Sequence, residues 1–468
     1  MSKDTKTGDS PDFTRRRWLT LTGIGISGLV AGCSGGGDSN TEGETTQPTP
    51  DETTTDESTT TEEPTTTQEP TTTEEPTATP EPTPVGEPPQ DAGSYFDPDS
   101  GFADPAPWVE SEDVSVNKVT EPTREALAEA VNQSGPRVVV FETSGTIDLG
   151  GEWISVENDK LWIAGQTAPS PGITIVKGML DIAANDCVVQ HLRVRPGDEG
   201  AGGSPSDLDS ISTSDDTQNN VIDHCSASWS TDESLSIGYD TNNTTVSNCL
   251  IAEPLHNSIH PKGAHGYAGL TGNNAKNVAY LGNVRAHAYA RNPRLKTGTE
   301  SVIVNETVFD FKRGVKLDSD SISSIVGNTY IDPVYAFEGV VREGGRVYLE
   351  DNAFVPEDTE PTEGVDEIFD ERPLWPEGLE AMSADEGHEH ALTHAGARPT
   401  DRTEYDERII SHIENRDPTE AFIDSQSEVG GYPELEENTH SLRIPEENLR
   451  YWLQWHALAV EDSEVSRP

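Results

Sequence analysis

Short β-rich runs recur along the middle of the chain, and one polar residue follows each run. The intervals between these polar residues are 33, 24, 35, 22, 23 and 24 residues. A repeat of about 20–25 residues that holds short strands and no helix is typical of one coil of a parallel β-helix, in which each coil buries its inner face on its neighbours. The two long intervals predict inserted loops. The polar residues are His191, His224, Asn248, Asn283, Asn305, Asn328 and Asn352.

Asn suits the turn of such a stack, because its amide donates and accepts hydrogen bonds and it tolerates the left-handed backbone of a tight turn. Leucine-rich repeats share the period, but their Leu-x-x-Leu-x-Leu frame is absent from this chain. We therefore expect an all-β parallel β-helix and not a sandwich or a propeller. Because the loops of repeat proteins gather on one face and carry function, we look for a functional site in the two inserts.

The sequence around the repeats predicts how the rest of the chain is divided. Thr123–Asn132 has the apolar stripe of a short amphipathic helix that caps the β-helix. The last part of the chain is acidic and broken by Pro, fits no coil repeat and contains a candidate helix at 405–415. We expect it to be irregular and to pack along the β-helix. The expected segments are a signal at 1–33, a stalk at 34–92, the β-helix domain at 93–355 and the C-terminal extension at 356–468.

The N-terminal segment has the pattern of an export signal. Arg15, Arg16 and Arg17 precede an apolar, Gly-rich stretch that ends at Gly32 and Cys33. Only 14 residues separate Arg17 from Gly32, whereas about 20 are needed to span a bilayer, which argues against a transmembrane helix. The pattern resembles a twin-arginine lipoprotein signal. This resemblance implies export by the twin-arginine pathway, cleavage before Cys33, and lipidation that anchors the protein to the outer face of the cell membrane.

The segment that follows the signal consists mainly of Thr, Glu, Pro and Ser. It has too few large apolar residues to offset the entropy of ordering, so we expect a disordered stalk. Pro and like charges keep such a chain extended. The folded part would therefore stand away from the membrane and touch it only through the lipid anchor.

The composition narrows the choice of partner and habitat. The chain has 31 Lys+Arg against 85 Asp+Glu, a formal net charge of −54. It shows no basic face that could hold phosphates, which excludes nucleic acid as a partner. An acidic surface poor in Lys is a common adaptation to high salt, so we expect a halophilic source. Three of the four cysteines lie outside the signal, and we expect them to be buried without a disulfide framework.

Carboxylates gather around the first insert. Asp207 and Asp209 lie in the insert, and Asp232 and Glu233 lie in the next coil. Carboxylates at i and i+2 of a strand point to the same side, and several from adjacent coils make an oxygen-rich site suited to Ca²⁺. In so acidic a chain, one Asp-x-Asp pattern alone is weak evidence. The alternative is that these are ordinary solvated acidic residues.

Cationic side chains gather around the second insert. Lys262 and His265 lie in the insert, and Arg291, Arg294 and Lys296 follow one coil later. Because cations are scarce in this chain, their convergence on one face predicts a site for an anion. The alternative is that they are surface counter-charges for nearby carboxylates.

The acidic block resembles a known family. Val221–Ser226, followed by Asp232–Leu235, is similar to the signature block of pectate lyases of the first polysaccharide lyase family, and the halophilic character suggests an archaeal type. The resemblance implies a right-handed parallel β-helix, an acidic polysaccharide as substrate and Ca²⁺ as cofactor. By position, the calcium ligands are Asp207, Asp209 and Asp232. Ser236 stands at the fourth ligand position, so Glu233 or substrate carboxylates would complete the coordination.

The cationic block extends the resemblance. The segment from Arg291 to Arg294 is similar to the Arg-x-Pro segment of pectate lyases, which implies that Arg291 is the base that removes the C5 proton of galacturonate. Lys296 then stands where the family often has a second substrate-binding Arg, beside Arg294. Lys262, with His265 as its competitor, corresponds to the substrate-binding Lys of the family.

These observations predict a secreted, monomeric pectate lyase that cleaves polygalacturonate by Ca²⁺-assisted β-elimination and yields unsaturated oligogalacturonides. We expect Asp223 and His224 to be a hydrogen-bonded turn pair of the stack and not an acid and a base. Two rival functions remain. A β-helix glycoside hydrolase could draw its carboxylate pair from the acidic block. A non-catalytic polysaccharide-binding surface protein could use the same scaffold, because a fold does not determine a function.

Overall fold

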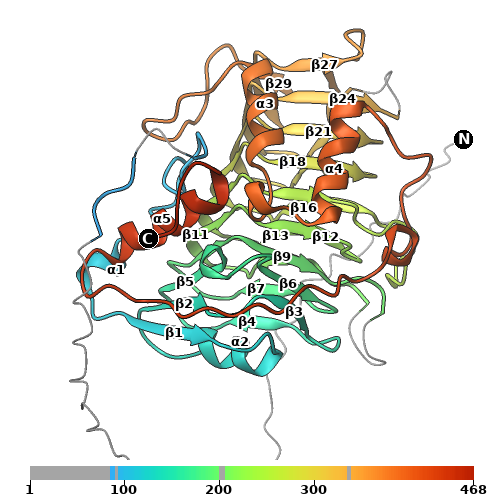
Figure 1. The fold of residues 1–468 in the computed structure, drawn as a ribbon. Helices are drawn as coiled ribbons and strands as arrows, with labels where there is room; N and C mark the ends of the chain where they lie inside the picture. Colours follow the sequence, from blue (N-terminus) through green and yellow to red (C-terminus); the bar gives the residue numbers. More distant parts are fainter. Residues whose placement is uncertain (1–84, 90–92, 200–205, 335–338) are drawn as a thin grey trace, which may run out of the picture. The chain divides into compact units, whose positions relative to one another are not determined.

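The computed structural model describes residues 85–89, 93–199, 206–334 and 339–468. Over these ranges the chain winds into a parallel β-helix whose strands form three sheets, as Figure 1 shows. The expected fold class is thereby confirmed. The expected signal, its Cys33 and nearly all of the expected stalk lie outside the described residues. None of the helices in the described part is long and apolar enough to cross a membrane.

Each coil contributes one strand to each sheet, and each strand pairs in parallel with the strand one coil away. The first sheet consists of β1 (Ser115–Val119), β2 (Arg137–Phe141), β5 (Leu161–Ala164), β8 (Val188–Gln190), β11 (Gln218–Asp223), β14 (Asn242–Ser247), β17 (Lys276–Leu281), β20 (Glu300–Val304), β23 (Ile322–Val326), β26 (Arg346–Glu350) and β29 (Glu367–Ile368). The second sheet consists of β4 (Ile154–Val156), β7 (Leu180–Ile182), β10 (Ile211–Thr213), β13 (Glu233–Ile237), β16 (Tyr267–Thr271), β19 (Arg294–Leu295), β22 (Val315–Leu317), β25 (Val341–Arg342) and β28 (Thr362–Glu363). The third sheet consists of β3 (Gly145–Asp148), β6 (Ile173–Val176), β9 (Leu192–Arg195), β12 (Ser226–Ser228), β15 (Leu250–Ala252), β18 (Val284–Ala288), β21 (Thr307–Phe311), β24 (Thr329–Pro333) and β27 (Ala353–Val355).

A left-handed turn residue follows the first-sheet strand in seven successive coils, from β8 to β26. These residues have φ angles from 46 to 66° and are His191, His224, Asn248, Gly282, Asn305, Gly327 and Asp351. Three residues of the predicted polar column, Asn283, Asn328 and Asn352, lie one position later. The amide of Asn283, for example, accepts from the Cys249 N–H at 2.8 Å and donates to the Val246 carbonyl at 3.0 Å. The sequence pattern could not show this offset, because both positions of the turn accept polar side chains.

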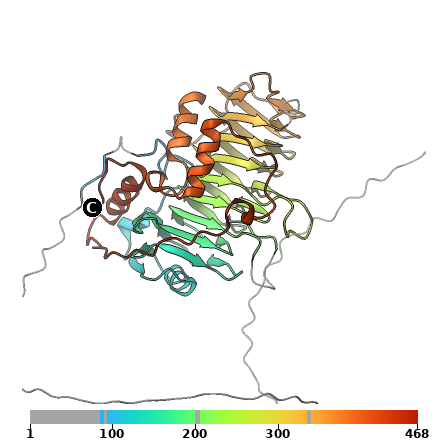
Figure 2. The ribbon, with the colours of Figure 1, turned by 45° about the vertical axis from the view of Figure 1, so that its right-hand side comes forward.

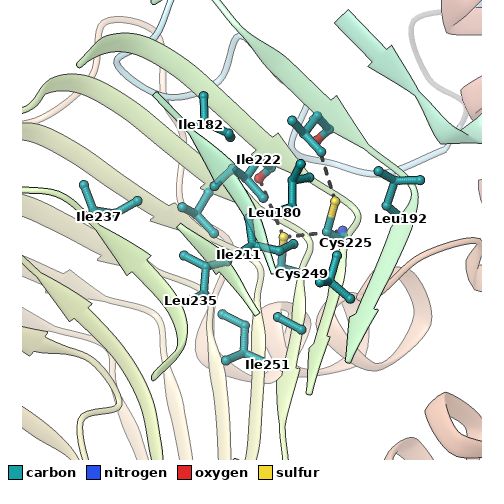
Figure 3. Packing of buried hydrophobic residues seen from close by; sticks show 14 of the residues in the cluster. Leu180, Ile182, Leu192, Ile211, Ile222, Cys225, Leu235, Ile237, Cys249 and Ile251 are labelled. Atoms are coloured by element: carbon teal, nitrogen blue, oxygen red, sulfur yellow. Dashed lines mark hydrogen bonds between the residues drawn. The ribbon is translucent and has the colours of Figure 1, made fainter. Parts of the chain in front are cut away.

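Aliphatic side chains from all three sheets fill the interior of the β-helix, as Figure 3 shows around Ile222 and Ile251. Cys187, Cys225 and Cys249 are buried in the same core and form no disulfide, as the sequence predicted. Burial raises the pKa of the Cys187 and Cys225 thiols to about 12, so both stay protonated near neutral pH. The interior therefore contributes stability, and the chemistry must lie on the outer faces of the sheets.

Helix α2 (Arg124–Val131) covers one end of the β-helix, whereas α1 (Trp108–Ser111) packs against the first sheet. The short helix α1 precedes β1, and α2 follows it. The Thr123 hydroxyl accepts from the Ala126 N–H at 3.3 Å, which caps α2 at its N-terminus. Leu127 and Val131 on the apolar stripe of α2 belong to the core of the first coils. The structure confirms the predicted capping helix.

After β28 and β29, which continue two sheets of the β-helix, the C-terminal extension packs along its outside. Figures 1 and 2 show α3 (Ala384–His394) and α4 (Glu404–Asn415) lying side by side along the strands of the third sheet. Ile409 and Ile413 of α4 pack in one cluster with Phe309 of β21. Helix α5 (Leu449–Glu461) instead packs Trp452 and Leu453 against the first sheet. The shorter 3-10 turns are η1 (Gly165–Thr167), η2 (Pro399–Asp401) and η3 (Gln426–Val429).

A buried ionic cluster ties α4 to the third sheet. The Asp406 carboxylate accepts from Arg193 Nε at 3.1 Å, Arg195 Nη2 at 2.6 Å and Ser226 Oγ at 3.0 Å. Asp406 and the two arginines are each at most 2% exposed. Burial alone would raise the pKa of Asp406, but the two guanidinium groups outweigh it and lower that pKa. One carboxylate thus balances two buried cations.

We expect Asp406→Ala to lower the free energy of unfolding by about 3–5 kcal/mol, because it leaves two buried guanidinium groups without their carboxylate. Chemical denaturation followed by tryptophan fluorescence in high salt would measure the loss. Glu414→Ala, at an exposed position of the same helix, should change it by less than about 0.5 kcal/mol. Equal effects of the two substitutions would contradict a stabilising role for the buried cluster.

Candidate active site

The candidate residues lie beside one another on successive coils at the second sheet. Glu233 of β13 pairs with Tyr267 of β16 in the strand register. The Glu233 N–H donates to Asp209 Oδ1 at 3.1 Å, which holds the preceding coil beside it. Ala290 bridges to Tyr267, so Arg291 follows one coil later. These residues therefore form a column that runs from two acids through an aromatic ring to a guanidinium.

Three carboxylates converge at one end of this column. Asp209, Asp232 and Glu233 each offer one oxygen, and these oxygens lie within 4.8 Å of one another. Asp209 and Glu233 are almost fully buried, at 2% and 1% exposure. An all-oxygen donor set is what hard cations such as Ca²⁺ prefer. The residues present therefore fit the predicted ion, and we call them the acidic triad.

Two residues from the predicted calcium site stand outside this triad. Asp207 has an exposed side chain and is not one of the converging carboxylates. Ser236 at the fourth position is buried, and its Oγ has no hydrogen-bond partner in the described part of the chain. The structure thus brings together Asp209, Asp232 and Glu233 from the predicted set and leaves Asp207 at the surface.

Arg291 lies against the acidic triad. Its guanidinium forms an ion pair with the carboxylate of Glu233 and stacks over the Tyr267 ring, 3.8 Å from the ring centroid. The backbone of Arg291 is left-handed, with a φ of 62°, a conformation that non-glycine residues adopt mainly in turns and at functional sites. Burial and then the charge of Arg294 lower the pKa of Arg291 to about 10, although Asp232 and Asp209 oppose this shift.

Beyond Arg291, further cations surround a small pocket. The pocket has a volume of about 90 Å³ and is lined by Tyr267, Ala290, Arg291, Arg294, Arg313, Lys316, Arg342 and Glu343. Arg294, Lys316 and Arg342 pair with one another in register on three successive coils. In a chain with a net charge of −54, five cations around one pocket make a local site for anions. We call these five the cationic pocket.

Sequence reasoning found two of the five cations, Arg291 and Arg294, and missed the other three. The signal that could have found Arg313, Lys316 and Arg342 is the coil repeat itself, extended by two coils beyond the Arg291 segment. The cations are not free in this structure. Arg294 pairs with Asp318 at 2.6 Å and Lys316 pairs with Glu343 at 2.6 Å.

The other predicted substrate-binding residues separate in space. His265 is buried, and its Nε2 lies 3.5 Å from Asp232 Oδ1. His260, which the sequence analysis did not single out, places its Nε2 3.8 Å from Asp232 Oδ2. The Lys262 side chain is exposed, and Lys296 lies over the Tyr239 ring, 4.4 Å from the ring centroid. Of the two candidates in the second insert, His265 is therefore the one beside the acidic triad.

Asp223 and His224 lie on the first sheet, away from this column. His224 Nδ1 and Asp223 Oδ2 are 2.9 Å apart, and Asp223 also accepts from Gln190 and Ser247. Burial opposes ionisation of Asp223, but His224, the charge of His191 and the Gln190 hydrogen bond lower its pKa to about 2. A fully buried carboxylate held by neighbours in three coils fits the expected structural role.

We expect Asp232→Asn to weaken Ca²⁺ binding by about tenfold or more, because it removes a charged ligand from the acidic triad. Asp207→Asn is the matched control. It should change the Ca²⁺ affinity by less than about threefold. An exposed carboxylate outside the triad attracts the ion only through solvent, which screens its charge. Isothermal titration of both variants with Ca²⁺ measures this. A larger loss for Asp207→Asn would contradict the triad as the ion site.

Comparison with known proteins tests the predicted class of enzyme. No protein-family model matches the chain. It is similar to proteins named probable pectate lyase C from Aspergillus flavus, at 27% identity over 345 residues (69% of this chain, 78% of the relative), and from Emericella nidulans, at 28% over 327 residues (66% and 73%). A solved Bacillus pectate lyase in complex with trigalacturonate aligns at 14% identity with a TM-score of 0.45 (60% of this chain, 94% of the other). The similarity to the curated relatives supports the expected class of enzyme, a polysaccharide lyase.

Proposed function

We propose that the chain is a secreted pectate lyase that cleaves polygalacturonate by Ca²⁺-assisted β-elimination and releases unsaturated oligogalacturonides. One observation carries the proposal. The coils of the second sheet bring the acidic triad, Arg291 and the rest of the cationic pocket next to one another. Carboxylates suited to a hard cation, beside cations suited to an acidic sugar, are the arrangement this chemistry requires.

The cationic pocket binds the substrate in this proposal. Successive parallel strands lie about 4.8 Å apart, so Arg294, Lys316 and Arg342 present positive charge at a regular spacing along the sheet. Guanidinium groups can hold a carboxylate through two parallel hydrogen bonds, which fixes its orientation as well as its position. A polymer with one carboxylate per sugar matches such a row of cations.

The acidic triad holds the ion, through Asp209, Asp232 and Glu233. The chemistry that Ca²⁺ supplies when bound is positive charge at the uronate carboxylate, which acidifies the C5 proton. Arg291 then takes this proton. For this it acts as a neutral guanidine, a form that burial and the neighbouring charge of Arg294 favour. The electron pair of the C5–H bond forms the C4–C5 double bond, the C4–O4 bond breaks, and water protonates the departing O4.

The first test is catalysis itself. In high salt with Ca²⁺, the full chain should release ultraviolet-absorbing products from polygalacturonate, because β-elimination leaves a conjugated double bond at the new end. Excess chelator should abolish turnover and leave the circular dichroism spectrum unchanged, because the ion lies outside the core. New reducing ends without ultraviolet absorbance would indicate a hydrolase. The absence of turnover on any uronate polymer would favour a binding protein.

Two lysine variants serve as the internal control for the proposed base. Arg291→Lys keeps the charge but not the geometry of the guanidine, so kcat should fall by about 10²-fold or more. Arg294→Lys should instead act mainly on KM, because a residue that only binds substrate contributes equally to the ground and transition states. An unchanged kcat for Arg291→Lys would remove this residue from the role of base.

We also propose that the protein is exported by the twin-arginine pathway and anchored through lipid on Cys33, at the surface of a halophilic cell. The arginine cluster before the apolar stretch and the Cys after Gly32 support this. Cys33→Ala should shift the protein from the membrane fraction to the medium or leave its signal uncleaved. Immunoblots of the fractions would measure this. A variant that is processed and retained at the membrane like the unaltered chain would refute the anchor.

A further inference from the structure

The guanidinium of Arg291 serves as the counter-cation of the acidic triad in this structure. It is paired with Glu233, and the charges of Asp232 and Asp209 also attract it. The Glu233 side chain is only 2% exposed, so water provides little compensation for its charge. A buried carboxylate in such a place needs a cation beside it, and Arg291 is that cation here.

A divalent ion held by the triad would need the same carboxylate. Glu233 is one of the three residues whose carboxylate oxygens converge, and the same carboxylate is paired with Arg291. Two cations that share one buried carboxylate repel each other in a medium of low dielectric constant. The ion and the guanidinium therefore compete for Glu233.

The surroundings of Arg291 limit where its side chain can go when it leaves Glu233. Arg291 also lines the cationic pocket, together with Arg294, Arg313, Lys316 and Arg342. Those cations repel a guanidinium that moves toward them, unless a carboxylate enters the pocket at the same time. A uronate carboxylate supplies that negative charge. Release from Glu233 is thus favoured when ion and substrate are both bound.

We propose that Arg291 and a divalent cation exchange at Glu233, so that Glu233 holds the base in reserve until the metal binds. Glu233 is then a positioning residue, which acts through Arg291. Only one part of this inference rests on the proposed function, namely that the released Arg291 acts as the base. The competition itself concerns metal binding and can be measured without substrate.

The test is a titration of the full chain with Ca²⁺ alone, in the unaltered protein and in Arg291→Ala. Removing the competing guanidinium should tighten Ca²⁺ binding by about tenfold, a coupling of ordinary size between two ligands of one site. Arg294→Ala is the matched control, because Arg294 lines the same pocket but pairs with Asp318. Its affinity should stay within about twofold of the unaltered chain, since a charge that does not share the carboxylate acts only at longer range.

A double substitution tests whether Arg291 affects Ca²⁺ binding through Glu233. In a Glu233→Gln background, Arg291→Ala should give no further gain in Ca²⁺ affinity, because the shared carboxylate is gone. Arg291→Gln, which keeps hydrogen bonding without charge, should reproduce the gain if Arg291→Ala disturbs the fold. Equal gains for Arg294→Ala, a gain that persists without Glu233, or no gain at all would overturn the exchange, as would a failure of every variant to bind Ca²⁺.

The two proposals can fail separately. If the unaltered chain cleaves polygalacturonate with Ca²⁺ but the Arg291 variants show no tighter binding, the exchange is overturned and the lyase function stands. If the Arg291 variants bind Ca²⁺ more tightly while the unaltered chain yields no unsaturated product, the exchange is supported and the lyase function is overturned. If Glu233→Gln changes kcat more than KM at saturating Ca²⁺, this supports the role of Glu233 in positioning Arg291.

Discussion

The parallel hydrogen bonds between successive coils are the constraint on which the rest of the structure depends. They place residues that are one coil apart in the sequence about 4.8 Å apart in space, on the same face of a sheet. Asp209, Glu233 and Tyr267 become neighbours in this way, as do Arg294 and Lys316. Because aliphatic side chains close the interior, any polar group that is to meet a ligand must project outward. The candidate site is thus a set of positions aligned on successive coils.

Ion pairs between nearby side chains hold the charged groups of the candidate site in place. The chain carries a net charge of −54, yet cations line one pocket on the second sheet. Arg291, Arg294, Lys316 and Arg342 each pair with a nearby carboxylate, as Arg291 with Glu233 and Lys316 with Glu343 show. High salt screens exposed pairs over a few ångströms but affects a nearly buried pair such as Arg291 and Glu233 much less. The nearly buried pair therefore keeps most of its strength at high salt.

The C-terminal helices bind the third and first sheets through buried ion pairs. Asp406 of α4 neutralises two arginines of the third sheet, and Glu253 of the coil after β15 pairs with Arg408 on the same helix at 2.7 Å. At the first sheet, Glu461 of α5 lies 3.2 Å from His191. Helices α4 and α5 therefore cover the third and first sheets, whereas the acidic triad and the cationic pocket lie at the second sheet, where Glu363 of β28 pairs with Arg342 at 3.4 Å.

The sequence by itself determined the repeating coil, because the repeat interval and the β-rich composition of each run can be read directly from the order of the residues. It also identified the blocks that hold Asp209, Asp232, Glu233 and Arg291, since carboxylates and scarce cations beside inserted loops stand out against the rest. Only the tertiary structure decided which of them meet. The one-residue offset of Asn283, the exposure of Lys262 and the approach of Arg313 and Arg342 depend on the register between coils and on loop packing. These arise from hydrogen bonds and contacts between distant segments, and no spacing along the chain records them.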